Sequence, residues 1–204
     1  RDMRFRLTWN PVEAIPKDSA AEKPGQRVLS WEEVRSIWWT DRVGYLTRQA
    51  LRLLIATGQR PSELLQAHRS ELGEGLWVIP GERVKNGRPH ALPLPGIIWQ
   101  EIERTLDVAP EAQWLFPSRG TPKAKRPWVS TSLAHAVKAV PEWDWTPRDI
   151  RRSWKTLAGE AGLSKDIRDR LQNHALSDVS SRHYDRYDYL AEKRAAMAQW
   201  ASVL

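Results

Sequence analysis

The feature of this chain that most constrains its fold is a series of segments with helical periodicity, interrupted by a short β-prone stretch. The segment VGYLTRQALRLLIATG places apolar residues at helical spacing and ends in Thr57-Gly58, a typical helix stop. The interruption starts with LWVIP and continues with ERVKNGRPHALPL, which predicts two strands around Asn86-Gly87, the favoured pair for a tight hairpin turn. The sequence therefore predicts a mainly α-helical domain with one small antiparallel β-sheet near its middle.

The helical part of the chain is preceded by a segment of different composition. Residues 1–28 are expected to form an interdomain linker, because NPVEAIPKDSAAEKPGQR combines prolines, small residues and mixed charges without a helical period. Ser30 and Glu33 have the spacing of a capping box and begin the helix WEEVRSIWW. Pro61 suits the first turn of PSELLQAH. After the hairpin, helical patterns return in GIIWQEIERTL, STSLAHAVKAV, TPRDIRRSWKTLAGEAG, SKDIRDRLQ, DVSSRHYDRY and LAEKRAAMAQWASVL.

Composition excludes several classes of protein and of site. The 204 residues suffice for one well-cored domain, and 41% of them are hydrophobic, which excludes a disordered chain. No apolar run approaches the roughly 20 residues that span a bilayer, so no membrane partner is expected. The chain has no signal peptide and does not begin with Met, so we expect an intracellular fragment of a longer protein. Without cysteine, disulfides, Cys-ligated zinc and thiol catalysis are excluded, and the net charge of +7 favours a polyanionic partner such as nucleic acid.

Two basic residues stand where a cation can meet an anionic substrate. Arg60 precedes a new helix, at whose start free N–H groups and the helix dipole already favour anions. Its guanidinium can bind two phosphate oxygens at once, and Glu63 can hold it in place. Lys85 lies beside the hairpin tip, where a mobile ammonium can reach a substrate. The alternatives are a surface Arg–Glu pair and a solubilising lysine.

A second pair of arginines stands in the segment TPRDIRRSW. Thr146 is expected to cap this helix, with Arg148 and Arg151 three residues apart on one face. Like charges one turn apart repel each other, and an anion bound between them would remove this repulsion. A solvated basic face is the alternative interpretation.

His174 follows a helix that Asn173 is suited to end. A lone histidine is usually structural. The other histidines are scattered and no HExxH pattern exists, so neither a bound metal nor another cofactor is expected.

The next segment contains the tyrosines Tyr184, Tyr187 and Tyr189. Tyr187 is one helical turn from Tyr184, which also fits core packing. A tyrosine hydroxyl is a poor nucleophile at its free pKa near 10. It becomes useful where cations stabilise the phenolate or the charge on an attacked phosphate.

Taken in order, the candidate residues resemble the catalytic pattern of the tyrosine recombinases, the phage-integrase family: Arg60, Lys85, Arg148, Arg151, His174 and Tyr184. TGQRPSEL resembles the first Arg box, VKNGRPHALPL the β-hairpin Lys box, TPRDIRRSWKTLAGEAG the His-x-x-Arg box and LQNH the last His box. HYDRYDYLAEKRAAMAQWASVL is similar to the tyrosine box and tail of prophage and genomic-island integrases, and NPVEAIPK to the linker before their catalytic domain. The resemblance covers residues 29–204 and implies a tyrosine recombinase-like catalytic domain, with the N-terminal DNA-binding domains lying outside this chain.

The resemblance implies a role for each basic position. Arg60 and Arg151 would clamp the non-bridging oxygens of the scissile phosphate, and Glu63 would support them. Lys85 would protonate the departing 5′ oxygen. The family usually has His where this chain has Arg148, and Arg stays protonated, so it cannot easily accept a proton. Arg148 would instead lower the pKa of the attacking tyrosine electrostatically.

The remaining roles fall to His174 and Tyr184. His174 would hydrogen-bond the phosphate and assist proton transfer. Tyr184 would attack the phosphate, giving a 3′-phosphotyrosine and a free 5′ hydroxyl without metal or ATP. Tyr184 is preferred to Tyr187 because the tyrosine of the family box precedes x-Arg.

The resemblance also implies partners and a place of action. These are double-stranded DNA attachment sites, a homotetramer on that DNA, accessory DNA-bending proteins and a cytoplasmic, nucleoid-associated location. In the C-terminal segment, Leu190, Met197 and Trp200 have spacings that approximate one helical face, and Lys193 and Arg194 are expected to lie outside that face. The resemblance also implies that this tail is exchanged between subunits. Two alternatives share the pattern. One is a catalytically impaired relative that binds DNA without cutting it, and the other is a type IB topoisomerase-like enzyme.

Overall fold

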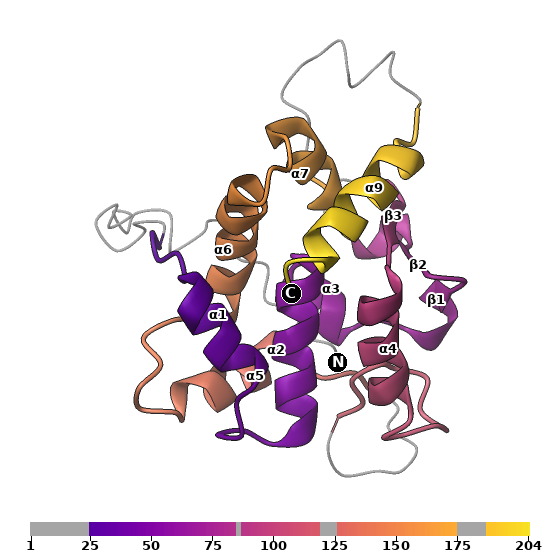
Figure 1. Ribbon diagram of the computed structural model, residues 1–204. Coiled ribbons are helices and arrows are strands. Elements are labelled where there is room, and N and C mark those ends of the chain that lie inside the picture. The colour runs from indigo at the N-terminus through magenta and orange to yellow at the C-terminus, as the bar shows by residue number, and fades with distance from the viewer. Residues whose placement is uncertain (1–24, 85–86, 119–125, 175–186) are drawn as a thin grey trace, which may run out of the picture.

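The computed structural model describes residues 25–84, 87–118, 126–174 and 187–204 (Figure 1). The α-helices of this part of the chain are α1 (Trp31–Trp38), α2 (Tyr45–Thr57), α3 (Pro61–Leu65), α4 (Gly96–Leu106), α5 (Ser130–Lys138), α6 (Pro147–Glu160), α7 (Lys165–Leu171) and α9 (Leu190–Ala201). The strands are β1 (Leu72–Gly73), β2 (Leu76–Ile79) and β3 (His90–Pro93), and the 3₁₀ turns are η1 (Arg69–Glu71) and η2 (Gly81–Arg83).

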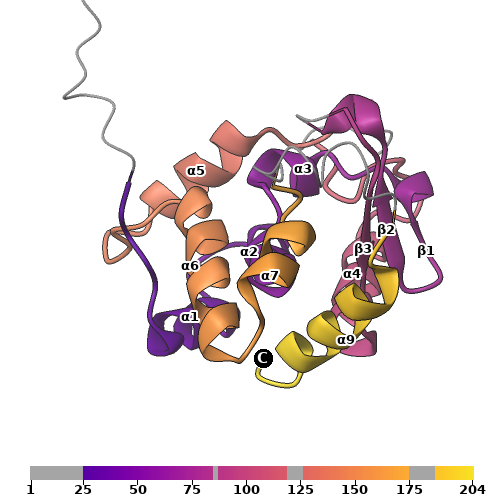
Figure 2. The same cartoon turned by 90° about the horizontal axis from the view of Figure 1, so that it is seen from above.

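Helix α2 lies at the centre of the fold. It contacts α1, α3, α4 and α6. The sheet and α4 lie on one side of it, and α1, α5 and α6 lie on the other (Figures 1 and 2). Buried residues occur on most sides of α2, and Leu51, Leu53 and Leu54 have no exposed area. The side that carries Arg48 and Arg52 is only partly buried. A helix with so wide an apolar surface is stable when its neighbours enclose most of it, which fits the central place of α2.

Gly58 ends α2 and sets the direction of the chain beyond it. Its φ of 64° lies in the left-handed region that glycine adopts without a Cβ penalty. Its N–H donates to the carbonyl of Leu54 at 2.9 Å. A Cβ at this position would overlap the indole ring of Trp154 on α6. The tight approach of α2 to α6 at Gly58 places Arg60, two residues later, close to α6.

The three strands form an antiparallel sheet in the order β1-β2-β3, which confirms the expected fold class. Trp77 pairs with Leu92, and Ile79 pairs with His90. Along β2, Trp77 and Ile79 are fully buried whereas Val78 is 41% exposed. This alternation is typical of a sheet that packs on one face.

One detail of the expected hairpin is wrong. The strand that pairs with β3 is β2, and the ERV segment, expected to be a strand, contributes to η2 instead. The N–H of Arg83 donates to Pro80 and that of Val84 to Gly81, at 3.0 and 3.2 Å. These local bonds use the donors that a strand would need for its ladder, and Pro80 itself has no N–H to donate. Gly87, with a φ of 70°, has the conformation expected of a turn glycine.

Helix α9 packs on β3 and α7 of its own chain, as Figure 1 shows in yellow. The Trp200 ring lies 5.6 Å from that of Trp154 and 5.7 Å from that of Trp31, between centroids. The expectation that Lys193 lies off the packed face is wrong. It is 8% exposed, and its Nζ donates to the carbonyl of Ala91 at 3.3 Å. A lysine stem can pack as an apolar chain while its ammonium reaches a polar partner, which a hydrophobic pattern does not register.

The start of the domain has the expected capping box. Ser30 Oγ accepts from the N–H of Glu33 at 3.3 Å, and Glu33 Oε2 accepts from that of Ser30 at 2.8 Å. Residues 1–24 of the expected linker and residues 178–186 of the expected DVSSRHYDRY helix lie outside the described residues. Among the residues that the structure describes, no helix combines the length and apolar character that crossing a membrane requires.

Candidate active site

Arg60 is the N-cap residue of α3 and is held there by Glu63. Arg60 Nη1 donates to Glu63 Oε1 at 2.7 Å, and the Arg60 backbone N–H donates to Glu63 Oε2 at 3.2 Å. The Glu63 side chain is 5% exposed, whereas that of Arg60 is 31% exposed. The buried carboxylate therefore fixes the guanidinium, which retains N–H groups for a ligand.

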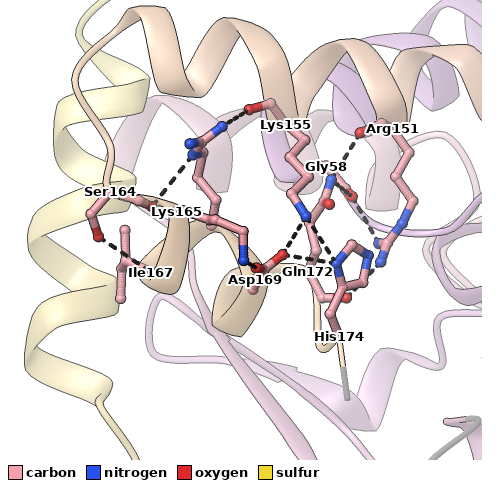
Figure 3. Close-up of polar contacts among 10 residues, drawn as sticks. Gly58, Arg151, Lys155, Ser164, Lys165, Ile167, Asp169, Gln172 and His174 are labelled. Atoms are coloured by element: carbon pink, nitrogen blue, oxygen red, sulfur yellow. Dashed lines mark hydrogen bonds and ion pairs between the residues drawn. The ribbon is translucent and has the colours of Figure 1, made fainter. Parts of the chain in front are cut away.

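Arg151 on α6 is anchored by two backbone carbonyls. Its Nη1 donates to Gly58 at 2.9 Å and its Nη2 to Gln172 at 2.6 Å (Figure 3). Burial and then the nearby charge of Arg60 lower the pKa of Arg151 to about 10, although Glu63 opposes this. Arg151 stays charged at neutral pH, and its repulsion from Arg60 means that an anion between them would be stabilised.

Arg148 lies one helical turn before Arg151 and is exposed. Arg60, Arg148 and Arg151 line one open pocket of about 660 Å³ together with Ser130, Thr131 and other residues from the starts of α3, α5 and α6. Thr146 is the N-cap residue of α6, and its backbone N–H and its hydroxyl both donate to Asp149 Oδ2 at 2.8 Å, which fixes where this helix begins. Arg148 and Arg151 lie on the side of α6 that lines the pocket.

His174 follows the end of α7 and lies beside Arg151 (Figure 3). Its Nδ1 is 3.0 Å from Asp169 Oδ1 and 3.4 Å from Lys155 Nζ. Lys155 also forms an ion pair with Asp169. Because Arg151 donates to the carbonyl of Gln172, two residues before His174, the same contact that fixes Arg151 also fixes the backbone that carries His174.

His90 on β3, one of the scattered histidines of the sequence, supports this site. It is 4% exposed, and its Nε2 lies 3.0 Å from the carbonyl of Leu171, to which it donates. Burial, followed by the charge of Lys193, lowers the pKa of His90 to about 3, so it is neutral at physiological pH. The hydrogen bond ties the hairpin strand to the end of α7. The alternation of β2 and β3 could have indicated that His90 points inward.

Lys85 and Tyr184, the remaining predicted site residues, lie outside the described residues. The sequence did not indicate Asp169 and Lys155, which contact His174. Lys155 stands four residues after Arg151, a spacing that puts both on one face of α6 and could have been read as a signal. Among the described residues, no group of three or more His, Asp or Glu side chains is placed to hold a metal ion.

The profile of the phage integrase family matches residues 27–190 of the chain. The chain belongs to the phage integrase family. The resemblance inferred from its sequence boxes is thereby confirmed. Two curated relatives from Escherichia coli (strain K12) match almost the whole chain: prophage integrase IntA, 25% identical over 198 residues, and prophage integrase IntZ, 24% identical over 205 residues. These matches cover 96% and 97% of this chain but only 48% and 50% of the relatives, so the chain spans about half their length.

Solved structures of integrases share the fold. The lambda integrase catalytic core has a TM-score of 0.59 at 17% identity, covering 74% of this chain and 94% of that one. A lambda integrase tetramer bound to a Holliday junction has a TM-score of 0.61 at 19% identity, covering 83% of this chain and 52% of that one. The Tn1549 transposon integrase in complex with circular intermediate DNA has a TM-score of 0.59 at 16% identity, covering 84% of this chain and 66% of that one. These identities are low, so the likeness establishes the fold alone.

Proposed function

We propose that residues 29–204 are the catalytic domain of a site-specific DNA recombinase that cleaves and rejoins DNA through a 3′-phosphotyrosine intermediate, integrating or excising a mobile element. The observation that carries the proposal is the pocket lined by Arg60, Arg148 and Arg151, with His174 beside Arg151 (Figure 3). Three cations around one pocket fit a phosphodiester better than they fit any neutral substrate.

The two fixed arginines suit the scissile phosphate. Arg60 is held by Glu63, and Arg151 by the carbonyls of Gly58 and Gln172, so neither needs to reorganise when charge develops. Preorganised donors of this kind stabilise a transition state more than a ground state when they are aimed at developing negative charge. Bound phosphate would also neutralise the repulsion between the two guanidinium groups.

We assign the covalent steps to Tyr184, Lys85 and His174. The Tyr184 oxygen attacks phosphorus, the bond to the 5′ oxygen breaks, and Lys85 donates a proton to that leaving oxygen. His174 contacts the phosphate and takes part in proton transfer. Rejoining is the same exchange in reverse with a different 5′ hydroxyl, so the bond energy is retained and neither ATP nor metal is needed.

The proposed substrate is double-stranded DNA that carries attachment sites. The similar proteins support this, because they are prophage integrases and integrases solved in complex with DNA. The lambda integrase tetramer on a Holliday junction supports a homotetramer on DNA. We further propose that residues 1–28 form a linker from N-terminal DNA-binding domains, that accessory DNA-bending proteins assist, and that the protein acts at the nucleoid in the cytoplasm.

One observation favours a second candidate function. Arg148 stands where the family usually has a histidine, which fits a relative that binds recombination sites without cutting them. A type IB topoisomerase-like enzyme would share the arginine clamp.

A single plasmid assay separates the three functions. The full-length protein that contains this chain is incubated in EDTA with a supercoiled plasmid carrying two direct copies of its element's junction sequence. We expect the plasmid to be resolved into two circles, and only when both copies of the junction sequence are present. Relaxation of a plasmid that lacks the junctions would indicate a topoisomerase, and binding without strand breakage would indicate an impaired relative.

A further inference from the structure

Two charged residues next to His174 have no part in the roles described above. They are Asp169 on α7 and Lys155 on α6 (Figure 3). Asp169 Oδ1 lies 3.0 Å from His174 Nδ1, and the Asp169 backbone carbonyl accepts the backbone N–H of His174 at 2.9 Å. Asn173, with a φ of 49°, provides the left-handed turn that folds the chain back for these contacts. One residue therefore fixes both the main chain and the ring of His174.

The contact with Asp169 determines which ring nitrogen of neutral His174 carries the proton. An ionised carboxylate only accepts hydrogen bonds, so a separation of 3.0 Å requires a proton on Nδ1. Lys155 Nζ also lies 3.4 Å from Nδ1, but its ammonium makes a closer contact with Asp169 Oδ1, to which it donates. The lone pair of His174 is consequently on Nε2.

Asp169 is ionised across the working range of pH. Burial alone would raise its pKa, but hydrogen bonds from Lys155, His174 and Lys165 outweigh burial and hold the pKa of Asp169 well below its usual range. Lys155 pairs with Oδ1, and Lys165 Nζ lies 3.2 Å from Oδ2. The carboxylate is thus a permanent acceptor for the Nδ1–H.

His174 is neutral mainly because it is partly buried. The charges that face it are Asp169 from α7, and Arg151 and Lys155 from α6. Burial lowers the pKa of His174, Asp169 raises it, and the two cations lower it again, with a net decrease. A histidine with a lowered pKa is deprotonated at neutral pH and ready to accept a proton at Nε2.

Among the described residues of the predicted site, His174 is the one that can accept the proton of the nucleophile. The three arginine side chains have only hydrogen-bond donors. The Glu63 carboxylate accepts from both the side chain and the backbone of Arg60. None of the described residues forms a hydrogen bond with His174 Nε2, and 35% of the His174 side chain is exposed.

We propose that His174, oriented by Asp169, is the proton acceptor for the attacking tyrosine, and that Asp169 acts as the residue that positions it. This inference rests on the proposed function. In the cleavage step the Tyr184 hydroxyl proton passes to His174 Nε2 as the tyrosine oxygen bonds to phosphorus. The bond from phosphorus to the 5′ oxygen breaks, and Lys85 supplies that oxygen with a proton. The imidazolium keeps its Nδ1–H on Asp169 until rejoining reverses the transfer.

The first test needs no DNA. The ¹⁵N shifts of the His174 ring are measured in this chain across pH, with assignment from the signals lost in His174→Gln. We expect a protonated Nδ1 and an unprotonated Nε2 at neutral pH. A ring that carries its proton on Nε2, or is doubly protonated at neutral pH, would overturn the proposal without any further variant.

Variants then distinguish positioning from a general loss of structure. In Asp169→Asn the stabilising carboxylate is lost, so the pKa of His174 should fall further and part of the population should move to the Nε2–H tautomer. Loosening of the site would instead raise this pKa toward its ordinary value, because burial is what lowers it most. Lys155→Met should shift the pKa upward, opposite to Asp169→Asn. Asp166→Asn, the same substitution on an exposed residue of α7, is the control and should leave it unchanged. Equal titration curves for Asp169→Asn and Asp166→Asn would refute the positioning role.

A second measurement examines the reaction itself in the full-length protein. Single-turnover cleavage of a nicked junction duplex should fall at least about 10-fold in Asp169→Asn, since a positioned proton acceptor contributes about 10²–10⁴-fold. Asp169→Glu should recover part of the rate. If the parent cleaves and Asp169→Asn matches its rate and pH profile, the inference fails while the proposed function stands. If the parent never cleaves although the ring has the expected tautomer, the proposed function fails and the acceptor role fails with it.

Discussion

The buried histidine of β3 makes the stability of the domain depend on pH in a defined direction. His90 is 4% exposed and neutral, with a pKa lowered to about 3 by burial and by Lys193. The unfolded chain binds a proton at this residue below about pH 6.5, and the folded chain does so only near pH 3. The folded-state pKa is below the unfolded one, so stability is complete above pH 6.5 and falls as the pH decreases from there to 3. Between pH 7.5 and pH 5 the loss from this residue alone is roughly 2 kcal/mol.

The assay is urea unfolding of the chain at several pH values, followed by far-UV circular dichroism. Other groups also titrate, so the parent is compared with His90→Gln, whose amide can still donate to the Leu171 carbonyl but cannot take up a proton. The difference in unfolding free energy between the two proteins should change by roughly 2 kcal/mol in favour of His90→Gln from pH 7.5 to pH 5. A difference that is constant across this range would show that His90 is not buried as a neutral donor in the folded protein.

Three further measurements test other parts of the structure. Gly58→Ala should destabilise the domain by about 2–4 kcal/mol, because it adds left-handed strain and an overlap with Trp154. The control Gly96→Ala, where the added Cβ meets open space, should destabilise it far less in the same urea assay. DNA binding by this chain, measured by fluorescence anisotropy, should weaken steeply and linearly in log affinity against log salt, and a salt-independent affinity would contradict a phosphate-binding surface. Arg148→Ala should slow single-turnover cleavage by an amount equivalent to a few kcal/mol of activation free energy. Arg148→His should keep or raise the parent rate and add a second ionisation to the pH–rate profile. An alanine variant as fast as the parent would show that Arg148 takes no part in cleavage.

Much of the fold was predictable because local chemistry and tertiary structure agree. The Ser30–Glu33 capping box, the stop at Gly58 and the start of α6 after Thr146 are each set by a few neighbouring residues. The ERV segment was misjudged because strand propensity cannot reveal that a turn at Pro80 takes the N–H groups first. Lys193 was misjudged because its burial depends on the edge of β3, which lies about a hundred positions earlier in the chain.

In the candidate site, too, the residues set by local sequence could be predicted and those set by long-range contacts could not. Arg60 and Arg151 could be predicted because each belongs to a recognisable sequence box, and the structure brings both to one pocket. Asp169 could not, because its contact with His174 spans five residues across a left-handed turn at Asn173 and follows neither helical nor strand spacing. The role of His90 depends on a hydrogen bond to a helix end 81 residues away. Contacts of this kind exist only once the fold is formed.

The residue that becomes attached to DNA can be identified directly. The full-length protein is incubated in EDTA with a nicked junction duplex, and the adduct is digested with trypsin and sequenced by mass spectrometry. We expect a phosphotyrosine link from Tyr184 to a 3′ end, with Tyr184→Phe forming no adduct and Tyr187→Phe still forming one. An adduct that persists in Tyr184→Phe, or that is attached to a 5′ end, would show that Tyr184 is not the nucleophile of the proposed cleavage.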